Sequence, residues 1–245
     1  EHWAAVRELL DRRARTHEAR MDGDEEAAAK AAQLLESLAA MHREDGESPD
    51  PLALFETLRR LHAAAPSNMA AATELANRYR RDHRWRHLAA VLESTVAHAP
   101  DAQTRSAAAR ELHEVLVEKL GDAARALSAL EASVGEDSED IELLRMLEAA
   151  YRRSNDDAGY RRVLQRIKPL ATAGEQIRVV EELAALAEAA DEAEAAAALY
   201  EELRRLDNGH LGAKRGLTRL LGRAGKHAQL VELLEVRLTE EELEA

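Results

Sequence analysis

One helix face occurs four times in this chain, at intervals of roughly seventy residues. Each interval has room for two helical hairpins, so the sequence predicts an array in which every hairpin packs on its neighbours along the chain. The four copies consist of Trp3, Val6, Leu9, Leu10 and Asp11; Trp85, Leu88, Val91, Leu92 and Glu93; Asp157, Tyr160, Val163, Leu164 and Gln165; and His227, Leu230, Leu233, Leu234 and Glu235.

The helix before this face is repeated as well. Leu75 and Tyr79 are followed by two arginines, Leu147 and Tyr151 are followed by two more, and Leu217 and Leu221 form a looser copy. Residues four apart share one face of a helix, so Leu and Tyr at this spacing pack on the same neighbour. We therefore expect Tyr79 and Tyr151 to be buried between hairpins.

The composition indicates what fills the core. Hydrophobic residues make up 46% of the chain but aromatic residues only 3%, so packing depends on Ala, Leu and Val. These residues recur at three- and four-residue spacing throughout, which predicts an all-α chain of about thirteen helices. We expect residues 1–245 to form a single repeat domain, and because the sequence starts inside a repeat we expect it to be a fragment of a longer array or multidomain protein.

Turn residues divide the array into a half repeat followed by six hairpins. Asn68, Asp101 and Asp140 each precede a predicted helix and are expected to cap it. A loop at 45–51 is the clear insertion, with Asp50 expected to cap a helix that begins at Pro51. The half repeat covers 1–21, and the hairpins cover about 24–66, 68–100, 101–138, 139–172, 173–208 and 209–243.

The hairpins resemble tetratricopeptide repeats (TPRs), in which a Leu precedes a Tyr by one turn in the first helix and a Pro closes the second. Residues 68–100 carry this pattern best, and Gly121 and Ala126 stand where the family has its turn glycine and small crossing residue. The resemblance implies a right-handed α-solenoid of about six and a half hairpins. The family's Trp is missing from the first helix and its Gly is replaced by Ala76, Glu148 or Thr218, so related superhelical repeats stay open.

Charge and cysteine content exclude several classes. The net charge of −13 disfavours nucleic-acid binding, and the absence of Cys excludes disulfides and thiolate sites within the chain. No membrane span or signal peptide is predicted, so we expect a cytoplasmic protein, with a periplasmic or exported one left open. Arg outnumbers Lys by 29 to 5, which is typical of a GC-rich, bacterial genome.

No motif of catalysis is present. The sequence has no phosphate-binding glycine loop, no GxSxG and no HExxH, so we expect neither an enzyme nor a cofactor. His83 and His87 share a helix spacing that could hold a metal, but they lack an obvious third ligand and are more simply surface residues. We therefore predict no metal site.

In TPR proteins the first helices line a groove that holds peptides, and the resemblance implies the same here. If Leu75 and Tyr79 pack inward, the polar residues of that helix and of its copies face this groove. The predicted peptide-binding residues are Asn77, Arg80, Arg81, Arg145, Arg152, Arg153, Arg215, Arg219 and Arg223, and in the intervening hairpins the same surface offers Glu36, Glu114, Glu118, Glu181 and Glu188.

Two interpretations of these charges stay open. The arginines could take the carboxylates of a partner, or arginines and glutamates could pair with one another between adjacent hairpins. The family's carboxylate clamp is not reproduced, because Thr73 stands where its Lys belongs. We expect a scaffold or adaptor that binds another protein or peptide, an acidic one under the first interpretation. The alternative is a regulatory or sensor domain of a larger enzyme or signalling protein.

Overall fold

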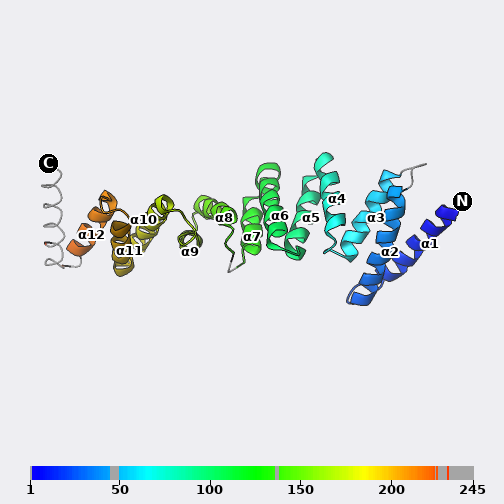
Figure 1. The fold of residues 1–245 in the computed structure, drawn as a ribbon, viewed down its shortest axis with the longest axis horizontal. Helices are drawn as coiled ribbons and strands as arrows, with labels where there is room; N and C mark the ends of the chain where they lie inside the picture. Colours follow the sequence, from blue (N-terminus) through cyan, green and yellow to red (C-terminus); the bar gives the residue numbers. More distant parts are fainter. Residues whose placement is uncertain (1, 45–49, 136–137, 224, 226–230, 232–245) are drawn as a thin grey trace. The chain divides into compact units, whose positions relative to one another are not determined.

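The computed structural model describes residues 2–44, 50–135, 138–223, 225 and 231, and all the secondary structure in this part of the chain is helical (Figure 1). The chain divides into two compact units, residues 1–138 and 139–245. Unit 1 contains α1 (His2–Glu18), α2 (Glu25–Glu44), α3 (Pro51–Ala64), α4 (Met69–Arg81), α5 (Trp85–His98), α6 (Ala102–Glu114), the π-helical turn η1 (Val115–Lys119) and α7 (Ala123–Ser133). Unit 2 contains α8 (Ile141–Ser154), α9 (Asp157–Ile167), α10 (Ala173–Ala189), α11 (Ala193–Leu206) and α12 (Leu211–Arg223).

Within each unit every helix packs on the next one along the sequence. The pairs α2–α3, α4–α5, α6–α7, α8–α9 and α10–α11 are the predicted hairpins, and α12 begins the sixth. The prediction of an all-α solenoid of helix-turn-helix hairpins is therefore confirmed. Organisation of the whole chain as one domain stays a prediction. Among the helices described, none combines the length and hydropathy needed to cross a bilayer.

The predicted helix caps are present. The Asn68 side chain accepts a hydrogen bond from the Ala71 amide, and Asp101 accepts one from the Thr104 amide. Asp50 accepts hydrogen bonds from two amides at the start of α3, where Pro51 is the first helical residue. These caps satisfy amides that have no partner inside the helix, so they fix where each helix begins. Of the insertion predicted at 45–51, residues 45–49 lie outside the described residues.

The core consists mainly of alanine, leucine and valine, with a tyrosine at the centre of several hairpins. Tyr79 is 4% exposed and Tyr151 is 6% exposed, which confirms the predicted packing of the first helices. The Tyr79 ring packs edge-on against Phe55 and is stacked on His87. In the second helices Leu88 and Leu164 are completely buried, as their place in the repeated face predicts.

The first copy of the repeated face does not pack as expected. Trp3 is 72% exposed, Val6 and Leu9 are also exposed, and Ala14 is the buried residue of α1, which packs on α2. The apolar residues have the spacing of the repeated face, but no described helix covers the side of α1 that carries Trp3, Val6 and Leu9. The fourth copy lies outside the described residues, so its packing stays a prediction.

The register of α12 differs from the one the sequence suggested. Leu217 is buried as expected, but Leu220 takes the deeply buried position and Leu221 is only half-buried. The reason lies at Gly216, where a Cβ atom would approach the Tyr200 ring to 2.5 Å. Because Gly216 has no side chain, the helix can rotate until its backbone rests on this ring.

Candidate functional site

A hollow of about 380 Å³ lies between α4, α5 and α6 of unit 1, on the surface that the first helices were predicted to form. Alanines and Leu92 make its apolar walls, while Thr73, Asn77 and Arg80 from α4 face Glu111 from α6. Alanines of α4 and α6 that line the hollow leave this space unfilled. The hollow therefore offers a shallow apolar floor with hydrogen-bonding groups and one ion pair at its edge.

Arg80 is held in place at this edge. Its Nη2 atom lies 2.6 Å from Glu111 Oε1, and its Nη1 donates to the Asn77 side-chain oxygen at 2.7 Å. The neighbouring Arg81 is exposed and donates only to the backbone oxygen of Asn77, at 3.4 Å. Asn77, Arg80 and Arg81 thus lie together, but only Arg81 has a guanidinium without a carboxylate partner in the described residues.

In unit 2 the corresponding helix α8 carries Arg145, Arg152 and Arg153. Arg145 bonds Glu148 at 3.0 Å on its own helix and Glu175 at 2.6 Å on α10. Glu148 is only 7% exposed, so its carboxylate needs these partners to be tolerated in the core.

Arg178 of α10 supplies the second cation for this buried carboxylate. Its Nη1 lies 2.7 Å from Glu148 Oε1 and 3.1 Å from Glu182 Oε1. The hydrogen bond to Glu148 raises the pKa of Arg178 further above its already high value. Glu148 therefore links α8 to α10 through two arginines, one from each helix.

Arg152 lies about two turns beyond Arg145 on α8 and shares the Glu182 carboxylate of α10 with Arg178. Its Nη2 is 2.8 Å from Glu182 Oε1 and 2.5 Å from the Tyr160 hydroxyl oxygen, and the Tyr160 hydroxyl donates to Glu182. Burial, assisted by the hydrogen bond to Glu182, raises the pKa of Tyr160 to about 12. Arg153 is exposed and forms no ion pair within the described part of unit 2.

The three predicted residues of α12 are all exposed, but they differ in their partners. Arg219 forms two hydrogen bonds of 2.5 Å with Glu188 of α10, and Tyr200 donates to the same carboxylate at 2.9 Å. Arg219 is the main cause that lowers the pKa of Glu188 below its usual value, and Arg223 adds to the effect. Arg215 has no ion-pair partner among the residues described.

Ion pairs therefore link the first helices of successive hairpins, as the second interpretation of the charges predicted. The partners are about one hairpin length apart in sequence. The pairs are Arg43–Glu74 (2.6 Å), Arg80–Glu111 (2.6 Å), Arg145–Glu175 (2.6 Å), Arg152–Glu182 (2.8 Å), Arg178–Glu148 (2.7 Å) and Arg219–Glu188 (2.5 Å). Of the glutamates predicted to lie on this surface only Glu188 takes part in these pairs. Glu111, Glu175 and Glu182 were missed, although a search for opposite charges 30 or 31 residues apart would have found them.

The predicted set falls into two groups by location. Asn77, Arg80 and Arg81 belong to unit 1, whereas the arginines of α8 and α12 belong to unit 2. A single wall formed by both groups stays a prediction. Within the described residues, no group of three His, Asp or Glu side chains is arranged to hold a metal ion. His83 packs edge-on against Trp85 instead, and His87 stacks on Tyr79.

A second hollow of about 570 Å³ lies between α5, α6 and α7. Val96, Leu112 and Ala129 contribute to its apolar lining, and Glu93 and Arg125 pair at its edge with a distance of 2.7 Å. The hydrogen bond with Glu93 raises the pKa of Arg125. Most of its lining belongs to the second helices α5 and α7, and none of its lining residues is one of the predicted peptide-binding residues.

No protein-family model matches the sequence, and no curated protein matches it. Solved structures similar to this one include MamA (16% identity over 72% of this chain and 92% of that chain, TM-score 0.40) and YrrB, described as a TPR protein with an unusual peptide-binding site (14%, 78% and 90%, TM-score 0.37). Another is a tetratricopeptide repeat protein from Parabacteroides merdae (17%, 85% and 79%, TM-score 0.37).

The architecture of the chain is assigned from the packing of its own hairpins. Leu75 and Tyr79 pack inward from the first helix of a hairpin, Leu88 and Leu92 pack from its second helix, and Leu147 and Tyr151 repeat the first pair in unit 2. Successive hairpins pack in sequence order within each unit. In its architecture the chain is a TPR-like helical repeat protein.

Proposed function

We propose that this chain is a protein-binding scaffold or adaptor, and that the first helices of its hairpins hold a segment of another protein. The observation that carries this proposal is the hollow between α4 and α6, which Thr73, Asn77 and Arg80 line. Its alanine floor can take an apolar side chain, while the polar edge can bond the backbone of an extended segment.

The ion pairs divide the predicted residues into two roles. Arg80, Arg145, Arg152 and Arg219 are engaged with glutamates, so they position the surface and contribute little charge to a ligand. Arg81, Arg153 and Arg215 have no carboxylate partner in the described residues and can form charge-assisted hydrogen bonds. We therefore propose an acidic segment as the ligand. In unit 1 the arginine available to it is Arg81, and in unit 2 the available arginines are Arg153 and Arg215, with Arg223 on the same helix as Arg215.

The experiment compares two variants that each add one indole ring to an exposed alanine. Ala107 lines the hollow from α6, whereas Ala90 is exposed on α5 and does not line it. Ala107→Trp would fill the hollow, and Ala90→Trp is the matched control. Immobilised parent and variant chains are incubated with a lysate of the source cell, and the bound proteins are identified. Loss of partners from Ala107→Trp alone is the expected result, while identical partner sets for all three chains would refute the use of this hollow.

A further inference from the structure

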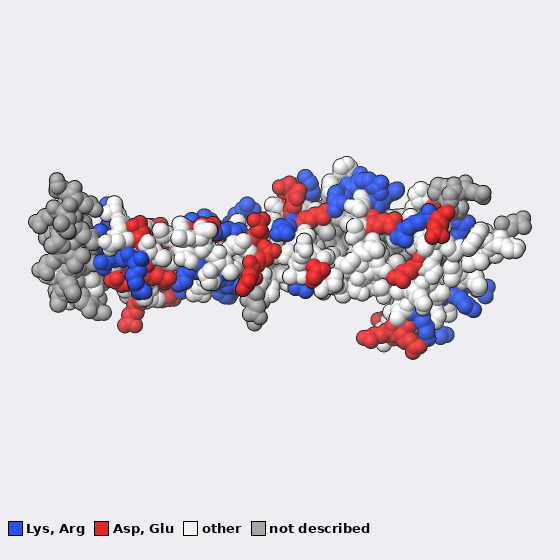
Figure 2. All heavy atoms as spheres, in the orientation of Figure 1, with Lys and Arg blue, Asp and Glu red and all other residues white. Residues whose placement is uncertain are grey.

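The end of the second hairpin carries a cluster of cations in a chain whose net charge is −13. Figure 2 shows Lys and Arg side chains gathered at the edge of unit 1 over the turn between α4 and α5. Within the segment 78–87 there are five arginines and a single acidic residue, Asp82. The net charge of this segment is therefore positive, whereas that of the whole chain is negative.

Three of these five arginines are not neutralised. Arg78 pairs with Asp82 at 2.9 Å, and Arg80 pairs with Glu111. Arg81, Arg84 and Arg86 are exposed and have no carboxylate partner within the described residues of unit 1. Their guanidinium groups are therefore free to bond an external anion.

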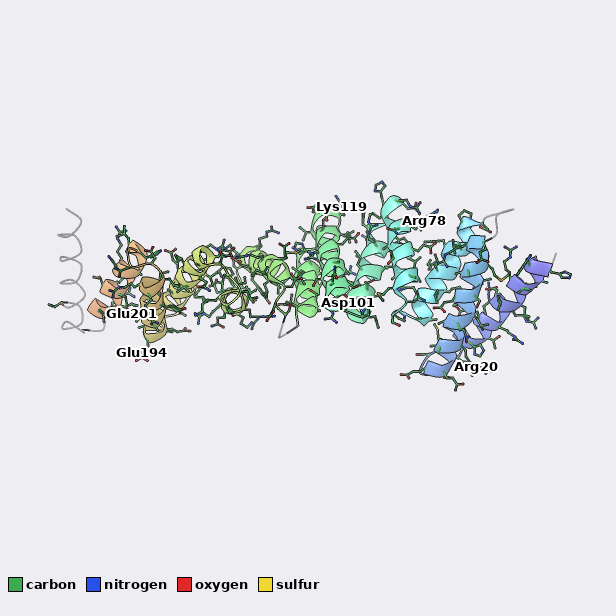
Figure 3. The ribbon with its side chains drawn as sticks, in the orientation of Figure 1. Arg20, Arg78, Asp101, Lys119, Glu194 and Glu201 are labelled. Carbon is green, nitrogen blue, oxygen red and sulfur yellow. The ribbon has the colours of Figure 1, made fainter. Side chains whose placement is uncertain are left out.

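A fourth cation reaches the same edge from the next hairpin. The last turn of that hairpin's first helix is π-helical, with the Leu120 amide bonded to the Val115 oxygen, and it ends at Lys119. Lys119 Nζ lies 5.9 Å from the centre of the Trp85 ring. Trp85 stands between Arg84 and Arg86 in the sequence. Figure 3 labels Lys119 and Arg78 at this edge, while Asp101 lies at the other end of α6.

We propose that this basic edge, formed by Arg81, Arg84, Arg86 and Lys119, is a docking site for an Asp- and Glu-rich segment of a partner protein. It is separate from the first-helix hollow, with which it shares only the neighbourhood of Arg81. Planar guanidinium groups bind carboxylates through two parallel hydrogen bonds, and several carboxylates along an extended segment can match cations spaced around a turn. Two acidic groups beside the site limit its net positive charge: Asp82, which pairs with Arg78, and Glu118, which lies 3.7 Å from Lys119 Nζ.

The surroundings favour carboxylates of a protein over a nucleic acid or a membrane. Base stacking needs a free aromatic face, but the Trp85 ring already has Lys119 over it and His83 against its edge at 5.3 Å. A membrane-binding surface needs apolar side chains beside the cations, and the exposed residues 81–84, 86 and 87 are all polar. Nonspecific nucleic-acid binding also needs a long track of cations, whereas this one is confined to the end of a hairpin.

The test measures binding of a fluorescently labelled Asp/Glu peptide to the whole chain by anisotropy. The double variant Arg84→Glu/Arg86→Glu removes two cations that lie outside the proposed groove set. The control Arg162→Glu/Arg205→Glu makes the same charge change at two exposed arginines of unit 2 that have no ion-pair partner in the described residues and belong to neither proposed site. Arg84→Gln/Arg86→Gln guards against effects of charge reversal, and circular dichroism checks the fold.

We expect the Glu variant to raise the dissociation constant about tenfold or more, the Gln variant to raise it less, and the control to change it by less than about twofold. Equal losses in the Arg84/Arg86 and Arg162/Arg205 variants would mean a response to net charge alone and would overturn the site. Tighter binding of single-stranded DNA or of anionic vesicles than of the peptide would overturn the assignment of the partner. The Ala107→Trp variant should bind this peptide like the parent, so failure of the hollow and failure of the basic edge give different results.

Discussion

Arg178 of α10 donates to the Glu148 carboxylate of α8 at 2.7 Å, and Glu148 keeps only 7% of its surface exposed. Glu148 occupies the position at which the TPR pattern has a glycine. A carboxylate there would be costly alone, but Arg145 and Arg178 approach it from two helices. The departure from the pattern is therefore compensated by an ion pair that links two hairpins.

Removing this carboxylate should destabilise unit 2. Glu148→Ala removes the anion that Arg145 and Arg178 share, while these arginines keep their pairs with Glu175 and Glu182, and we expect a loss of about 1 to 3 kcal/mol. Glu192→Gln, which breaks the more exposed pair with Arg161, should cost less than about 1 kcal/mol. Hydrogen exchange of α8–α10 peptides measures both changes. Equal protection in the two variants would contradict a structural role for Glu148.

The buried tyrosines should be essential to their hairpins. Tyr79→Ala and Tyr151→Ala each remove a ring from a site that is less than about a tenth exposed, so we expect each to cost about 3 to 5 kcal/mol. Urea unfolding followed by circular dichroism measures the loss. Because repeats unfold in sections, the Tyr79 variant should lower protection from exchange in unit 1 and leave α9–α11 protected. A melt that matches the parent would show that the ring is not part of the core.

Two glycines should not tolerate a methyl group. A Cβ atom at Gly159 would lie 2.3 Å from the Tyr151 ring, and one at Gly216 would lie 2.5 Å from the Tyr200 ring. Since both rings are buried, alanine at either position should cost about 1 to 3 kcal/mol. Gly174→Ala is the matched control, because no atom lies within 4 Å of its Cβ position, and it should be neutral or slightly stabilising. The thermal unfolding midpoints of the three variants are compared with that of the parent. If Gly174→Ala lowered the midpoint as much as the other two, a steric clash with the tyrosine rings would not be the cause.

Adjacent arginines on α8 should respond differently to charge reversal. Arg152 bonds Glu182 and Tyr160, so Arg152→Glu places a second carboxylate beside Glu182 and should cost about 1 kcal/mol. Arg153 has no such partner in the described residues, and Arg153→Glu should change stability by less than about 0.5 kcal/mol. Chemical unfolding of the two variants is the measurement. If the acidic segment binds here, Arg153→Glu should nevertheless weaken binding.

Unit 1 should lose stability in mildly acidic solution through His62. Burial, with a smaller contribution from the charge of His98, lowers the pKa of His62 below its ordinary value of 6.5. The unfolded chain therefore takes up a proton near this pH that the folded chain resists, so the contribution is present above about pH 6.5 and is lost as the pH falls below it. His62→Gln should show a smaller loss than the parent between about pH 7.5 and 5 in thermal melts. If the melting temperatures of the two chains changed with pH in parallel, His62 would not be the source of the loss.

The sequence predicted the packing of each hairpin better than the contacts between hairpins. Leu75 and Tyr79 belong to one helix, so their spacing determines which face is buried. The pairing of Arg80 with Glu111 depends on how α4 and α6 are rotated against each other, which no local pattern determines. The rotation of α12 depends on the contact of Gly216 with the Tyr200 ring. The exposure of Trp3 depends on whether another helix covers its side of α1.

The central claim, that the first-helix surface holds a partner protein, can be tested by crosslinking from single positions. A benzophenone amino acid replaces Asn77, which lines the hollow, or Ala90, which is exposed on the second helix of the same hairpin. Each chain is irradiated in lysate of the source cell, and crosslinked proteins are identified by mass spectrometry. We expect a defined partner to be crosslinked from position 77 and to be absent from the products of position 90. The same products from both positions, or products from position 90 alone, would contradict it.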